Sequence, residues 1–194
     1  MGKIHNLLDR RPYCAYRMPM GPAESVRKAL EFWSGLGCQA LPYDIDAELR
    51  PAGWTGVELR GGSSGKDFMK SFLSDNDSVL GILNLSKRFR RWLPNEFALG
   101  IAAPLNGSGP GGTELVCFQS GLDASGADLS RPGEYIEYQL AELGKALGAE
   151  GLLLAPARPF RERDLPEGHP LGLVPWLTAR NKAKKTLKQH KRRG

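Results

Sequence analysis

The acidic residues of this 194-residue chain end at Glu167, and every charged side chain after that point is a cation. Eight of the chain's 27 lysines and arginines lie within residues 180–193. Residues 1–179 hold the other 19 cations and all 21 acids, so the net charge of +6 combines a strongly basic C-terminal segment with a slightly acidic body. Because its like charges repel one another, this segment has little means of forming a core of its own.

The body, in contrast, has the composition of a folded domain. Hydrophobic residues make up 41% of the chain, and its length fits one domain of roughly 100–200 residues plus a tail. No run approaches the ~20 apolar residues of a membrane-spanning helix, and residues 1–14 lack the apolar stretch of a secretory signal. We therefore expect a cytoplasmic protein with no membrane partner, and a monomer as the default.

The cysteines and histidines argue against disulfides and metal sites. Cys14, Cys38 and Cys117 are odd in number and far apart, so we expect them to be reduced and buried. None of the three histidines shares a metal-ligand spacing with them. We expect neither a metal nor a cofactor.

Apolar patterns of both helical and strand type interleave along the body without a strict alternation. Extended segments are expected at residues 12–18, 38–45, 55–60, 97–104, 114–119 and 150–157, with a hairpin joining 97–104 to 114–119. Helices are expected at residues 22–35, 66–73, 78–92 and 133–147. The pattern predicts an α+β fold: a single compact domain with a mixed or antiparallel sheet packed by about four helices.

Proline content marks the predicted boundaries. Residues 156–175 contain five of the fourteen prolines and are interpreted as a non-helical linker or strap. The globular domain is accordingly placed at residues 1–155. Residues 176–194 are interpreted as a basic C-terminal arm, helical or disordered.

The basic arm carries the main functional prediction. Cations that neutralise phosphates release counterions, which gives salt-sensitive binding with little sequence preference. Nucleic acid is therefore the favoured partner, with RNA slightly preferred because flexible basic segments commonly fold on RNA. The candidate residues are Arg180, Lys182, Lys184, Lys185, Lys188, Lys191, Arg192 and Arg193.

A second basic cluster lies in the predicted helix at 78–92. Arginines form forked contacts with phosphates, and Trp92 beside them offers a stacking face, although a solvated helix face explains the same pattern. Its candidate nucleic-acid-binding residues are Lys87, Arg88, Arg90 and Arg91.

A glycine-rich loop between a predicted strand and a predicted helix is open to several interpretations. A solvated turn is the simplest, and an anion site at the helix N-terminus is the next. The loop also matches the G-x-S-x-G pattern of hydrolases, with His169 downstream. Residues 63–68 resemble the SGGKDS loop of ATP pyrophosphatases, with Phe68 in place of the final serine. The candidate anion- or phosphate-binding residues are Gly62, Ser63, Ser64, Gly65 and Lys66.

One acidic segment contains residue types that can bind a metal ion. Asp44, Asp46 and Glu48 alternate along a short stretch, where an acidic surface turn is favoured over a magnesium site. No strong catalytic signature is present. The sequence thus favours a nucleic-acid-binding accessory protein over two alternatives: an enzyme acting on a phosphate-bearing or nucleotide substrate at the GGSSGK loop, and a protein-binding adaptor or inhibitor, such as a mobile element encodes.

Overall fold

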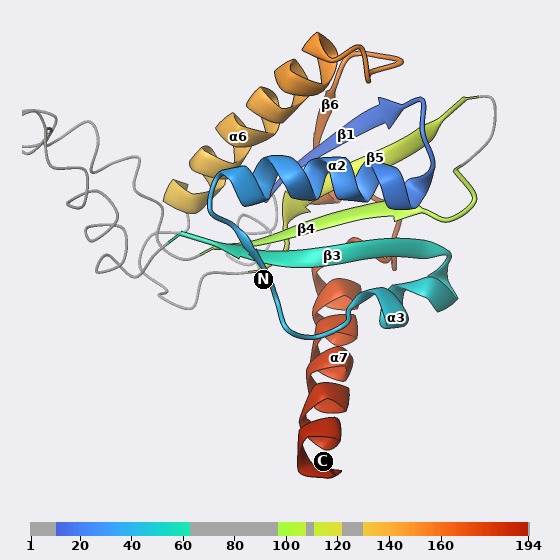
Figure 1. The fold of residues 1–194 in the computed structure, drawn as a ribbon, viewed down its shortest axis with the longest axis vertical. Helices are drawn as coiled ribbons and strands as arrows, with labels where there is room; N and C mark the ends of the chain where they lie inside the picture. Colours follow the sequence, from blue (N-terminus) through green and yellow to red (C-terminus); the bar gives the residue numbers. More distant parts are fainter. Residues whose placement is uncertain (1–10, 63–96, 108–110, 122–129, 194) are drawn as a thin grey trace, which may run out of the picture.

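A computed structural model of the chain describes residues 11–62, 97–107, 111–121 and 130–193 (Figure 1). Within these residues six strands form one antiparallel sheet in the order β2-β3-β4-β5-β1-β6. The strands are β1 (Pro12–Met18), β2 (Gln39–Ala40), β3 (Trp54–Gly61), β4 (Phe97–Pro104), β5 (Thr113–Gln119) and β6 (Arg158–Arg161).

Helices cover both faces of this sheet. Two of them, α2 (Pro22–Gly35) and α6 (Ser130–Ala149), pack on one face, while α3 (Asp46–Leu49) and the start of α7 (Leu173–Arg193) pack on the other (Figure 1). Two 3-10 turns, Arg50–Ala52 and Glu162–Asp164, follow α3 and β6. Figure 1 shows α7 running away from the sheet, so that the C-terminus lies at its far end.

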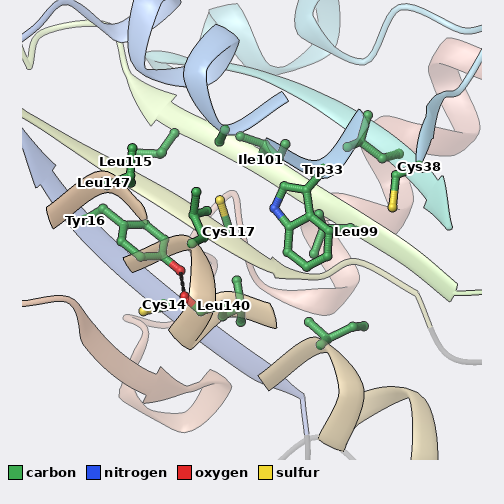
Figure 2. Packing of buried hydrophobic residues seen from close by; sticks show 14 of the residues in the cluster. Cys14, Tyr16, Trp33, Cys38, Leu99, Ile101, Leu115, Cys117, Leu140 and Leu147 are labelled. Carbon is green, nitrogen blue, oxygen red and sulfur yellow. Dashed lines mark hydrogen bonds between the residues drawn. The ribbon is translucent and has the colours of Figure 1, made fainter. Parts of the chain in front are cut away.

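The face under α2 and α6 holds the larger of two cores. Alternate strand residues point into it, as the period of two along a strand requires. Trp33 of α2 is fully buried there, and the Tyr16 hydroxyl donates a hydrogen bond of 2.6 Å to the carbonyl of Leu140 in α6 (Figure 2). The predicted α6 stripe faces this core: Ile136, Leu140, Leu143 and Leu147 are all buried.

The opposite face carries the core that receives α7. Its strand residues are the other members of each alternation, including Tyr13, Val116 and Phe118. Trp176 of α7 is fully buried and meets Phe118 edge to face, with ring centroids 4.8 Å apart. This second core is what fixes the position of the C-terminal helix.

Most sequence-based expectations for the body are confirmed. The fold is α+β, with one antiparallel sheet and four helices in the described residues. The hairpin of β4 and β5 pairs as expected, and the three cysteines are free and buried. The expected helices at 66–73 and 78–92 lie outside the described residues.

Two local predictions are wrong. Residues 150–157 form no strand, because Leu152 and Leu153 instead pack against the first core just after α6, where Leu152 N–H donates to Leu147 O at 2.9 Å. Leu154 is 51% exposed. The proline-rich stretch is not free of helix either, since α7 begins at Leu173. Pro175 lies in its first turn, where a missing N–H costs nothing.

Candidate nucleic-acid interface

The structure does not set residues 176–194 apart as an arm, because α7 begins earlier and its first half is docked on the body. The backbone N–H of Leu173 donates to Glu162 Oε1 at 2.6 Å, which satisfies a donor that the helix itself leaves free. The other carboxylate oxygen of Glu162 pairs with the buried Arg11. Just before the helix, Tyr13 donates to the carbonyl of Leu171 at 3.0 Å.

A buried glutamate of β3 fixes the next turn of α7. The side chain of Glu58 is 0% exposed and accepts hydrogen bonds from Tyr43 and Ser120, each at 2.5 Å. Trp176 Nε1 donates to the same carboxylate at 3.3 Å, and Arg180 Nη1 lies 3.5 Å from Glu58 Oε1. Burial, together with the hydrogen bond to Glu58, raises the pKa of Tyr43. The carboxylate thus ties the sheet, the β2–α3 connection and α7 together.

This network gives one of the predicted nucleic-acid-binding residues a structural partner. The side chain of Arg180 is only 21% exposed, and it faces Glu58 across the sheet–helix boundary. A carboxylate buried this deeply is costly unless it is paired and hydrogen-bonded. Sequence reasoning missed Glu58 because its partners lie 15 to 122 residues away, and a charge in TGVELR reads as exposed.

The middle of α7 packs along α3. Ala183 is buried and Leu187 half-buried in the core that also holds Ile45 and Leu49. The ammonium of Lys184 lies 5.2 Å from the centre of the Tyr43 ring, a cation–π contact at the edge of this packing. Leu187 is the last residue of α7 that contacts the core.

The rest of the α7 surface is cationic. Within the described part of the chain, no acidic side chain forms an ion pair with the following residues, all of which are exposed: Lys182, Lys184, Lys185, Lys188, Lys191 and Arg192. The side chain of Arg193 is outside the described residues. The helix therefore holds one set of cations on a rigid support, with the packed stripe behind them.

The other predicted site residues are not brought to this surface by anything the structure describes. Ser63, Ser64, Gly65 and Lys66 lie outside the described residues, as do residues 87–91. Gly62 ends the described part of that loop with φ of 77°, a left-handed conformation that favours glycine.

The acidic segment considered for magnesium serves the fold. Asp46 accepts hydrogen bonds from Thr55 Oγ1 at 2.6 Å, from Gly56 N at 3.0 Å and from Arg50 Nε at 2.6 Å. Partial burial opposes ionisation, but these donors outweigh it and lower the pKa of Asp46. The described residues contain no group of three or more histidine, cysteine or acidic side chains arranged to hold a metal.

Two further features of the body are His169 and a surface groove. His169 packs edge-on against Trp54 and accepts a hydrogen bond from Leu171 N at 3.2 Å, and burial lowers its pKa. A groove of about 750 Å³ runs between α6 and the β1–β6 edge. Apolar residues and four charged residues line it, and two of the charged residues, Glu137 and Arg161, form an ion pair at 2.9 Å.

Comparison with known proteins finds no match: no family model, curated protein or solved structure matches the chain. No helix in the described residues is both long and apolar enough to cross a membrane. The cationic surface of α7 is therefore the feature of the described residues that points to a function.

Proposed function

We propose that the protein binds nucleic acid through the exposed cations of α7 and acts as a binding or accessory protein rather than as an enzyme. The observation that carries the proposal is a group of six exposed cations on α7 that no acid in the described residues neutralises. Arg180 is left out of the contact set because it is engaged by Glu58. Arg193, Lys87, Arg88, Arg90 and Arg91 remain predicted contacts.

Nucleic-acid phosphates are the chemistry that this surface complements best. A polyphosphate presents anions at regular intervals, and each phosphate that a lysine or arginine neutralises releases a counterion. The cations stand on a helix that is already folded and that packs on the body as far as Leu187, so binding does not have to order the backbone and loses only side-chain entropy.

The choice between RNA and DNA stays open at this level. The preference for RNA rested on a flexible basic segment that folds on its target. In the structure residues 173–193 are helical in the absence of any partner, and the helix packs on the body as far as Leu187, so that reasoning no longer separates the two nucleic acids.

A truncation after Leu187 tests the proposal without disturbing the core. It removes Lys188, Lys191, Arg192 and Arg193 but keeps every α7 residue that packs on the body. Affinity for labelled nucleic acid should fall more than about 100-fold at ~0.1 M salt, and the salt slope should drop by about 3. Its urea midpoint should match that of the full chain. Full-length affinity and slope in the truncated protein would reject the proposal.

A further inference from the structure

The exposed surface of α7 has a ridge and two flanks. Asn181, Lys185, Lys188 and Arg192 follow one another at spacings of four, three and four residues, and all are exposed. At about 100° per residue these side chains fall within a sector of about 60°. That sector lies opposite the packed stripe of Trp176, Ala183 and Leu187.

The flanks carry cations on both sides of this ridge. Lys184 and Lys191 lie about 80° to one side of it, and Lys182 lies about 90° to the other. From Lys182 to Arg192 the helix rises about 15 Å, the length of roughly four base pairs. The charge is therefore spread over an arc of the helix rather than confined to one line.

We propose that α7 is inserted lengthwise into the major groove of B-form duplex DNA, an inference that rests on the proposed function and names its ligand. The ridge faces the base edges, and the flanks reach the phosphates of the two strands. An α-helix about 10–12 Å across fits a major groove about 12 Å wide, whereas the major groove of A-form RNA is too narrow to admit it.

The side chains of the ridge suit this position. Asparagine pairs with adenine edges, and lysine and arginine pair with guanine edges, all of them in the major groove. The body lies behind the packed stripe, on the side of α7 away from the ridge, and so stays outside the groove.

Single strands are less suited to the same surface. Their binding relies on bases stacking on aromatic side chains. Trp176 is the only tryptophan, tyrosine or phenylalanine in α7, and it is fully buried. The exposed face of the helix therefore offers mainly charge and hydrogen bonds, and among its described side chains only His190 and Arg192 are both exposed and able to stack on bases.

The test compares four labelled probes of one sequence by fluorescence anisotropy at equal ionic strength: DNA duplex, RNA duplex, single-stranded DNA and single-stranded RNA. The DNA duplex should bind at least about tenfold tighter than each of the others. Methyl green, a dye that occupies the major groove, should displace the protein, whereas the minor-groove ligand netropsin should not.

Matched variants locate the contact on α7. The ridge variant Lys185→Gln/Lys188→Gln/Arg192→Gln should lose at least about tenfold in affinity for the DNA duplex. The control Arg27→Gln/Lys145→Gln/Arg158→Gln removes the same charge from exposed positions on α2, α6 and β6, and should change affinity less than about threefold.

The outcomes separate the two proposals. Equal or tighter binding of an RNA duplex or a single strand, or displacement by netropsin alone, would overturn groove insertion and leave nucleic-acid binding standing. An equal loss of affinity in the ridge and control variants would also overturn it. If none of the four probes binds at low salt, the proposed function fails and the inference falls with it.

Discussion

The two halves of α7 use similar residues in opposite ways. In residues 173–183, which we call the anchored half, Trp176 is fully buried and Arg180 is directed at a buried carboxylate. In residues 184–193, the exposed half, lysines and Arg192 face solvent without an acidic partner in the described structure. A charge count treats Arg180 and Arg192 alike, yet only position relative to the sheet decides which one is available to a ligand.

The 21-residue helix α7 is held in place through its first half. The anchored half is fixed by apolar burial and by the carboxylates of Glu58 and Glu162, both of which come from the body. The acids of the body thus stabilise the helix, while the acid-free sequence beyond them leaves its far end cationic. Breaking the contacts of the anchored half should cost stability, whereas removing the exposed cations of the other half should alter binding only.

Trp176→Ala should have the largest effect. Removal of a fully buried indole from the second core should lower the free energy of unfolding by about 4 kcal/mol. Val174→Ala is the matched control on the same helix, because Val174 is 72% exposed, and it should change stability by less than about 0.5 kcal/mol. Urea denaturation followed by circular dichroism measures both. Similar losses in the two variants would mean that α7 is not docked as described.

Glu58→Ala should come next, at about 3 kcal/mol. It leaves the buried donors of Tyr43, Ser120 and Trp176 without their acceptor and Arg180 without its counter-charge. Glu137→Ala, which breaks the exposed pair with Arg161, should cost less than about 1 kcal/mol in the same urea assay.

A stable Glu58→Ala variant would contradict the anchoring role of this carboxylate. The double variant with Arg180→Ala separates the pair from the other three hydrogen bonds. Because no guanidinium is then left unpaired, it should be more stable than the sum of the two single losses implies.

A pair of arginine substitutions contrasts the two halves of α7 directly. Arg180→Gln should lower stability by about 1–2 kcal/mol, since Glu58 keeps its other donors, and should leave the salt slope of binding unchanged. Arg192→Gln should leave stability within about 0.5 kcal/mol of the parent and lower the slope by about 0.9. A lower salt slope in Arg180→Gln together with a stability loss in Arg192→Gln would contradict the roles given to the two halves.

The smallest expected effect is a pH dependence at the strap before α7. Burial lowers the folded-state pKa of His169 below its usual 6.5, so the unfolded chain binds the proton more readily. Stability should be complete above pH 6.5 and decline as the pH falls below it. Thermal unfolding across that window should show a shallower decline in His169→Gln. If stability declines equally in His169→Gln, the titration of other side chains causes the decline.

The sequence pattern predicted those features of the fold that are determined by residues close together in the chain. The α6 stripe and the alternation in β1, β4 and β5 were readable because burial repeats at fixed spacing along one element. The prediction of a strand at 150–157 was wrong, since three leucines in a row fit a strand as well as a loop that follows a helix and packs against the core. The Glu58 cluster was beyond prediction, because its members come from β3, the β5 end, the β2–α3 connection and α7.

The candidate interface was partly predictable for the same reason. The acid-free cation run is visible in the sequence, and it identified the exposed lysines together with Arg192. The end of the α7 packing at Leu187 and the pairing of Arg180 with Glu58 depend on contacts with α3 and the sheet. Tertiary packing therefore decides which of the predicted cations a ligand can reach.

Lysine acetylation of the intact protein, quantified by mass spectrometry with and without the tightest-binding nucleic-acid probe, tests the central claim most directly. Lys28 on α2 and Lys145 on α6 are internal references, since both lie away from α7 and pair with acids of the body. The account predicts that nucleic acid protects Lys182, Lys185, Lys188 and Lys191 while the references react at unchanged rates. Protection of the references with no protection on α7 would contradict it.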